Sequence, residues 1–208
     1  MLKLDGGALT RAFIVEWYLE EISVPYQFVQ LDMRTGAHLQ TNFLAINPMG
    51  KLPALVDGNF KLWESGAILL YLSQKYCQIP EAVEQQEEIS QWIFFANATL
   101  IPGLFTPQTC DREYPRLLKP LDEILQLQPF LLGKNFSLAD VAVGAVLAYI
   151  PLLLKLDLSF YPEEVINYIQ PLSKIDFHAY PAVESYIKRL GDRPDFQKTI
   201  GAEFLVCK

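Results

Sequence analysis

Hydrophobic and polar positions alternate over short runs in the first third of the chain. Runs typical of strands occupy Leu2–Leu4, Tyr26–Leu31, Ala54–Val56 and Phe60–Leu62. Helical spacing of apolar residues occurs at Thr10–Ile22, Arg34–Ala45 and Glu64–Tyr76. This order predicts a βαβ unit, a connecting helix and a ββα unit, with a hairpin turn at 57–59 where the sequence reads Asp-Gly-Asn.

The pattern becomes purely helical after residue 76. Helical spacing fits Glu81–Phe105, Arg112–Leu131, Ser137–Leu154, Glu163–Leu172, Tyr180–Gly191 and Pro194–Ile200. The chain is therefore predicted to hold an α/β domain at residues 1–76, a linker at 77–86 and an all-helical domain at 87–208.

The amino-acid composition limits the classes of molecule that the chain is expected to bind. Of 208 residues, 17 are Lys or Arg and 24 are Asp or Glu, which gives a formal net charge of −7. Because a basic excess is absent, we expect no nucleic-acid and no membrane partner. The longest nearly apolar run, Val141–Leu154, has 14 residues and is too short to cross a bilayer. Without a secretory pattern, a CxxC pair or metal-ligand spacing, we expect a cytoplasmic protein with no bound metal.

A proline interrupts the strand-like run at residues 52–56. Proline cannot donate to a sheet and is confined to strand starts, edges and bulges. Two interpretations follow for Pro53: a trans proline that opens an edge strand, or a cis bond that turns the chain sharply.

Two predicted helix starts carry an acidic residue and a serine. The first is Glu64-Ser65, where unpaired N–H groups suit either a simple helix cap or the binding of an anion. The second is Ser137-x-x-Asp140, a variant capping box before the long apolar run. We interpret Asp140 as a cap and not as an acid or base, because a buried helix start needs its donors paired.

Four stretches together resemble the glutathione transferase family: NPMGKLPAL, WESGAILLYL, FSLADVAVGAVLAYI and AYPAVESYIKRLGDRPDFQKTI. The opening GGALTRAFIVEWYLEE is most similar to the bacterial chi class and more distantly to the theta and beta classes. The resemblance implies an α/β thioredoxin-like amino-terminal domain (βαβαββα), an all-α second domain and a homodimer.

The resemblance also implies a glutathione site. In the family, Leu52 before cis Pro53 pairs with the cysteinyl amide of glutathione, as an added strand would. Ser65 and Glu64 hold the γ-glutamyl end, and we expect both to be accessible to solvent. His38 and Lys51 face the glycyl carboxylate, although each also suits an ordinary surface position.

Activation of the glutathione thiol is less clear from the sequence. Most classes use a Tyr, Ser or Cys after the first strand, but the segment 5–11 reads Asp-Gly-Gly-Ala-Leu-Thr-Arg and has none of these. Thr10 can donate a hydroxyl or serve only as a cap, and Arg11 can supply a permanent charge or pair with a surface carboxylate. Helix-terminal amides are a third possibility, and Arg11 is slightly preferred.

The expected activity is transfer of the glutathione sulfur to small hydrophobic electrophiles, such as isothiocyanates and activated aryl halides, with peroxide reduction as a further reaction. Glutathione is then a co-substrate, and no cofactor is expected. Two alternatives stay open: a glutathione-dependent isomerase or peroxidase, and a non-catalytic binding or scaffold protein.

Overall fold

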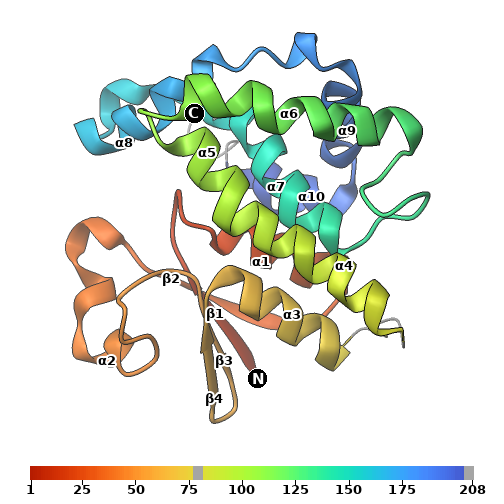
Figure 1. The fold of residues 1–208 in the computed structure, drawn as a ribbon. Coiled ribbons are helices and arrows are strands. Elements are labelled where there is room, and N and C mark those ends of the chain that lie inside the picture. Colours follow the sequence, from red (N-terminus) through yellow and green to blue (C-terminus); the bar gives the residue numbers. More distant parts are fainter. Residues whose placement is uncertain (77–81, 204–208) are drawn as a thin grey trace. The chain divides into compact units, whose positions relative to one another are not determined.

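The computed structural model describes residues 1–76 and 82–203 (Figure 1). The chain forms two compact units, Met1–Val83 and Glu84–Lys208. The predicted linker, 77–86, lies partly outside the described residues, and helix α4 (Val83–Phe94) begins within it. Each unit is described below by itself.

Unit 1 is a four-stranded mixed sheet with helices. Its elements are β1 (Leu2–Gly6), α1 (Ala12–Glu21), β2 (Tyr26–Gln30), α2 (Thr41–Leu44), β3 (Ala54–Asp57), β4 (Phe60–Trp63) and α3 (Ser65–Tyr76). The strand order is β2-β1-β3-β4, in which β1 and β2 are parallel and the other neighbours are antiparallel. This confirms the predicted thioredoxin-like topology.

The sheet and two helices enclose the core of unit 1. Leu2 and Leu4 of β1 are buried on either side of exposed Lys3, as the alternation of a strand requires. Helix α1 packs against β1 and α3, with Trp17 and Leu19 fully buried.

The connection between β2 and β3 differs from the prediction. Instead of one helix over Arg34–Ala45, it forms two 3-10 turns, η1 (Met33–Thr35) and η2 (Ala37–Leu39), followed by the short α2. The Asp32 carboxylate accepts from the Arg34 amide and side chain, and Gly36 between the turns has φ 72°. A left-handed residue cannot continue an α-helix, so the helix is broken there.

Unit 2 is helical throughout its described residues. Its main helices are α4, α5 (Ile101–Phe105), α6 (Cys110–Leu127), α7 (Leu138–Leu153), α8 (Glu163–Ile169), α9 (Pro181–Gly191), α10 (Pro194–Lys198) and α11 (Ile200–Glu203). Shorter turns are η4 (Leu158–Phe160), η5 (Gln170–Lys174) and η6 (Phe177–Ala179). Helix α7 is buried along nearly its whole length and forms the centre of this unit.

Several predicted helices of unit 2 have different limits; the one expected over Glu163–Leu172, for example, ends at Ile169. The helix expected over Glu81–Phe105 is divided by a π-helical segment, η3 (Phe95–Leu100), which separates α4 from α5. The helix expected to reach Leu131 ends at Leu127, because Gln128 is extended before Pro129. A residue before proline is disfavoured in the α conformation.

The start of α7 is held by Asp140. Its Oδ2 accepts from the amide and hydroxyl of Ser137, each at 2.8 Å. Its Oδ1 accepts from the Leu131 amide at 2.8 Å and from the Tyr186 hydroxyl at 2.9 Å. Burial raises the pKa of Asp140, and these hydrogen bonds act against that rise. The predicted capping box is confirmed.

Helix α9 begins at a second buried carboxylate. Oδ1 of Asp122 in α6 accepts from the amides of Ala182 and Val183, at 2.8 and 3.0 Å. It pairs two of the amides that a helix start leaves open. Side-chain caps between distant segments thus help to hold the helices of unit 2 against one another.

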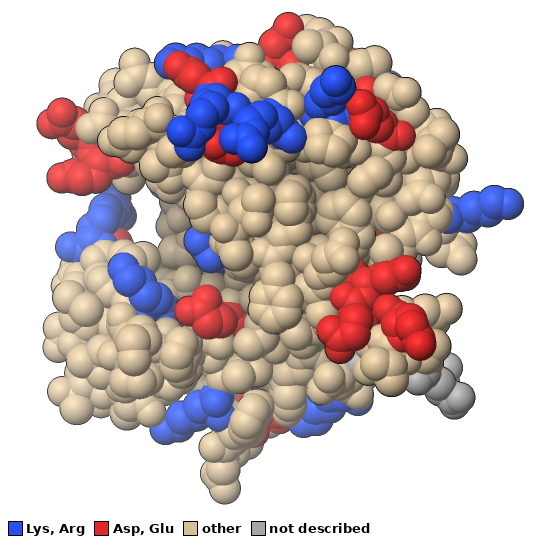
Figure 2. All heavy atoms as spheres, in the orientation of Figure 1, with Lys and Arg blue, Asp and Glu red and all other residues tan. Residues whose placement is uncertain are grey.

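Charges of both signs are mixed on the face in Figure 2, and its described residues show no continuous basic surface. Within the described ranges, no helix is both long and apolar enough to traverse a bilayer.

Candidate functional site

Three loops of unit 1 meet at one end of its sheet. Asp5 of β1 pairs with Ala54 of β3, and Ala54 pairs with Trp63 of β4. The loop after β1, the Leu52–Pro53 segment before β3 and Glu64 after β4 therefore leave the same end of three adjacent strands. The register thus brings together residues far apart in sequence.

Close packing joins the first two loops. A Cβ at Gly7 would collide with the Leu31 carbonyl oxygen and lie 3.4 Å from Cδ1 of Leu52. Only glycine fits this position, and it lets the loop after β1 lie against Leu52. The small residues noted in the sequence thus allow close approach of the two segments.

Thr10 closes the loop after β1. Its hydroxyl donates to the Gly7 carbonyl at 2.7 Å and accepts from the Gly7 and Ala12 amides at 3.3 and 3.4 Å. The hydroxyl proton is therefore used inside the loop, and it must turn away from Gly7 before it can reach a ligand sulfur. The N-cap position of α1 is Arg11, a partly buried residue, and not Thr10.

The Leu52–Pro53 bond is cis, as predicted. Pro53 is buried, and the amide and carbonyl of Leu52 have no hydrogen-bond partner within the described ranges. A backbone with an open donor and acceptor beside a strand start can pair with an extended peptide.

Asn47 supports this segment, and sequence reasoning missed it. Its side chain is 1% exposed, donates to the Lys51 carbonyl at 2.7 Å and accepts from the Met49 amide at 3.0 Å. It thereby fixes the turn that leads to Leu52. An Asn followed by Pro-x-Gly is a turn signal that could have identified it.

His38 and Lys51 come from neighbouring segments. His38 lies in η2, and a Cβ at Gly50, next to Lys51, would be 3.3 Å from the His38 carbonyl oxygen. Lys51 is exposed, and Nδ1 of His38 is buried with no hydrogen-bond partner. No hydrogen bond joins the two side chains in the described structure, so only the backbones of the two segments are close.

Glu64 and Ser65 differ in environment. Glu64 is exposed and has φ 71°, a left-handed conformation rare for a residue with a side chain. Such conformations cluster at ligand sites. Ser65, the first residue of α3, is only 2% exposed, so the expectation that both would be accessible is wrong for Ser65. Its place at the helix start keeps it beside the open amides of α3.

Other candidate groups contribute less. Among the described residues, no group of three His, Cys, Asp or Glu side chains could hold a metal ion. Cys110 is buried, and burial raises the pKa of its thiol, which disfavours a nucleophilic thiolate. Cys77 and Cys207 lie outside the described residues.

Models of two protein domains match the chain. The "Glutathione S-transferase, N-terminal domain" matches residues 3–74, and the "Glutathione S-transferase, C-terminal domain" matches residues 84–189. Together they cover more than half of the sequence. The chain belongs to the glutathione S-transferase family, and the predicted family membership is confirmed.

Characterised relatives agree with this assignment. Glutathione S-transferase 3 of Zea mays is 30% identical, with 97% of this chain and 94% of that protein covered. Disulfide-bond oxidoreductase YfcG of Escherichia coli is 29% identical, with 85% and 84% covered. A glutathione transferase from Burkholderia graminis, solved with two glutathione molecules per subunit, has a TM-score of 0.75 and 26% identity, over 97% and 88% of the two chains.

Proposed function

We propose that this chain binds glutathione at the end of the unit 1 sheet and transfers its sulfur to small hydrophobic electrophiles. The observation that carries the proposal is the left-handed Glu64, held beside a helix start at the same sheet end as Leu52 and the Gly7 loop. Isothiocyanates and activated aryl halides are the proposed electrophiles.

Each loop has a proposed role in holding the tripeptide. The open amide and carbonyl of Leu52 pair with the cysteinyl unit, and Glu64 meets the γ-glutamyl ammonium group. Ser65 and the first amides of α3 hold the γ-glutamyl carboxylate. His38 and Lys51 meet the glycyl carboxylate at the other end.

The reacting species is the thiolate. An ordinary thiol, with a pKa of about 8.5, is only a few per cent ionised at pH 7, so the site must favour the anion. Arg11 is the proposed source of positive charge, because the Thr10 hydroxyl already donates its proton to the Gly7 carbonyl. The thiolate attacks the electrophilic carbon, and for an aryl halide the halide leaves with the bonding electrons.

The experiment titrates bound glutathione by the ultraviolet absorbance of its thiolate in the wild type, Arg11→Ala and Thr10→Ala. Arg11→Ala is expected to raise the thiol pKa and to lower turnover of an aryl halide more than Thr10→Ala does. A shift only in Thr10→Ala would assign activation to the hydroxyl. If neither variant shifts the titration, activation belongs to the backbone amides.

A second candidate is glutathione-dependent disulfide reduction, which two glutathione molecules carry out by reducing one disulfide to two thiols while forming glutathione disulfide. The relative named disulfide-bond oxidoreductase and the structure with two bound glutathiones favour it. A disulfide substrate assayed beside an aryl halide and a peroxide separates the activities. Glutathione binding without turnover on any of them would indicate a binding or scaffold protein.

We also propose a cytoplasmic homodimer, with the chi class as the nearest within the family. Apolar side chains exposed on the chain, among them Leu39, Met49 and Phe60, suit a two-fold contact. Sedimentation at micromolar concentration tests the dimer.

A further inference from the structure

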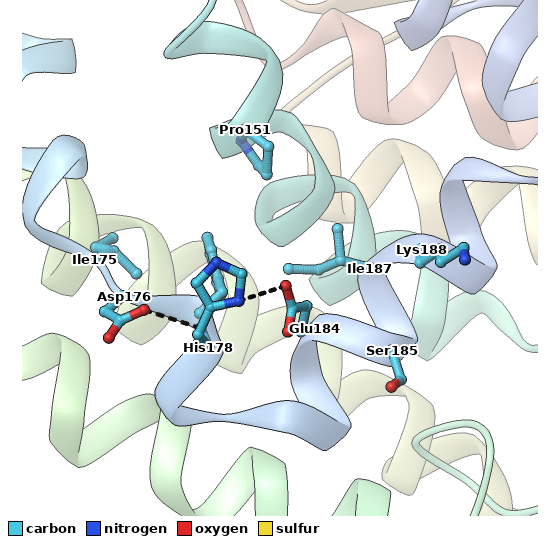
Figure 3. A pocket seen from close by; sticks show the side chains of 9 residues that line it. Pro151, Ile175, Asp176, His178, Glu184, Ser185, Ile187 and Lys188 are labelled. Atoms are coloured by element: carbon cyan, nitrogen blue, oxygen red, sulfur yellow. Dashed lines mark hydrogen bonds and ion pairs between the residues drawn. The ribbon is translucent and has the colours of Figure 1, made fainter.

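Unit 2 contains a pocket that the proposed reaction does not use. Its volume is about 600 Å³, within the range common for small-molecule sites. It lies between the last turn of α7, the turn η6 and the middle of α9 (Figure 3). All of its lining residues belong to unit 2, so its shape depends on this unit alone.

One wall of the pocket is apolar. Pro151, Ile175, Phe177 and Ile187 line it, and Ile175 is only 7% exposed. Their aliphatic and aromatic surfaces can cover the hydrophobic body of a small ligand.

The lining also presents hydrogen-bond acceptors. Nδ1 of His178 lies 2.9 Å from Oε1 of Glu184, and the His178 amide donates to Oδ1 of Asp176 at 3.0 Å (Figure 3). Oε2 of Glu184 and Oδ2 of Asp176 have no hydrogen-bond partner among the described residues, so each carboxylate keeps an open acceptor.

Charge at the rim is mainly negative. Asp176 and Glu184 each carry a carboxylate, and the lining cation, Lys188, extends along α9 away from the His178–Glu184 pair in Figure 3. A ligand carboxylate would be repelled here, whereas a positively charged donor would be attracted. The −7 charge of the chain acts in the same direction.

We propose that this pocket binds an amphipathic organic cation: a protonated primary amine attached to an aromatic or branched apolar body. An ammonium group has three N–H donors, and the open oxygens of Glu184 and Asp176 can accept from them. The body of the ligand rests on Phe177 and Ile187. This site is independent of glutathione binding.

The test uses 2-phenylethylammonium as probe and 3-phenylpropionate as its anionic counterpart, added to the full chain and followed by amide NMR shifts. The ammonium compound is expected to shift residues 175–178 and 184–188, and 3-phenylpropionate to leave them unchanged. Glu184→Gln and Asp176→Asn should each weaken binding about fivefold, which is the loss of about 1 kcal/mol at an exposed charge pair.

Asp157→Asn is the matched control. Asp157 also accepts from the amide two residues ahead, at 3.1 Å, but it does not line the pocket. Its variant should bind the probe as the wild type does. The proposal is overturned if Asp157→Asn weakens binding equally, if 3-phenylpropionate binds as well as the ammonium compound, or if the shifts map outside the pocket.

Discussion

Helix α7 begins at a carboxylate with four hydrogen bonds, whereas helix α3 begins beside a carboxylate that has none among the described residues. Asp140 is fully buried and accepts from four donors, including Tyr186 in α9. Glu64 is exposed and left-handed. The two sites share a serine and an acidic residue at a helix start before an apolar run, adjacent as Glu64-Ser65 and three positions apart as Ser137 and Asp140. A saturated carboxylate stabilises the fold, and an unsaturated one in a strained conformation is available to a ligand.

The largest expected effect is at the saturated site. Asp140→Ala should lower the free energy of unfolding by about 3–5 kcal/mol, because it leaves several buried donors unpaired. Urea denaturation measures this loss. Glu164→Ala, which removes an exposed acid from the first turn of α8, is the control and should change little. A loss below about 1 kcal/mol for Asp140→Ala would contradict the view that the Asp140 carboxylate, unlike that of Glu64, stabilises the fold.

The next effect concerns ligand binding at the start of α3. If glutathione occupies the proposed site, Glu64→Ala and Ser65→Ala should each weaken its binding by about 1–3 kcal/mol, since a charged group of the ligand loses its partner. Calorimetry gives the affinities. Glu87→Ala makes the same charge change at an exposed position of α4 and should leave affinity unaltered. Full affinity in both site variants would rule out this placement of glutathione.

The left-handed conformation can be tested without any ligand. Glu64→Gly should be more stable than Glu64→Ala by about 1 kcal/mol, because alanine retains the Cβ that disfavours a positive φ. The same pair at Gln74, exposed within α3, should show the opposite order by about 1 kcal/mol. Thermal or urea unfolding of the four variants shows whether glycine or alanine is the more stable residue at each position. Alanine as the more stable residue at both positions would contradict strain at Glu64.

A third carboxylate is intermediate in its number of bonds between Asp140, which has four, and Glu64, which has none among the described residues. Asp57 at the end of β3 is paired with Lys75 and accepts from the Tyr71 hydroxyl at 2.8 Å, and these bonds lower its pKa. A lowered pKa gives stability that is present above about pH 4 and is lost as the pH falls through the folded-state value.

Asp57→Asn should therefore cost up to about 1 kcal/mol at pH 7 and almost nothing near pH 2, after discounting for solvent screening of a partly exposed pair. Urea denaturation at both pH values gives the comparison. Glu88→Gln, at an exposed position of α4, serves as the reference variant. An equal loss at both pH values would show that the charge of Asp57 is not responsible.

Local sequence patterns predicted most of the fold. They did not predict the backbone conformation of Glu64 or the burial of Ser65 at the candidate site. Alternation in β1 and the apolar length of α7 located those elements, because burial repeats with the period of the structure. A capping pattern does not encode the sign of φ, so Glu64 could be identified only as a helix start. Ser65 was expected to be accessible, since its burial depends on how the surrounding chain packs.

Long-range hydrogen bonds also could not be predicted from the sequence. Nothing near Asp122 indicates that it caps α9, because its donors, Ala182 and Val183, lie about sixty residues later. Asn47 is a different case: its bonds are local, within four residues, but the Asn-Pro-x-Gly pattern indicates only a turn and not which backbone groups the side chain binds.

The Asp140 network has a consequence for protein synthesis. Tyr186 follows Asp140 by 46 residues, so translation at about 5–20 residues per second separates the two by roughly 2–9 seconds. During that interval the nascent chain holds a helix start that lacks one of its four donors. The donors Leu131 and Ser137 precede Asp140 and are available at once. The hydrogen bonds at the start of α7 are therefore expected to be complete only after α9 has been made. The strand pairs of unit 1, in contrast, are complete once Trp63 has been made.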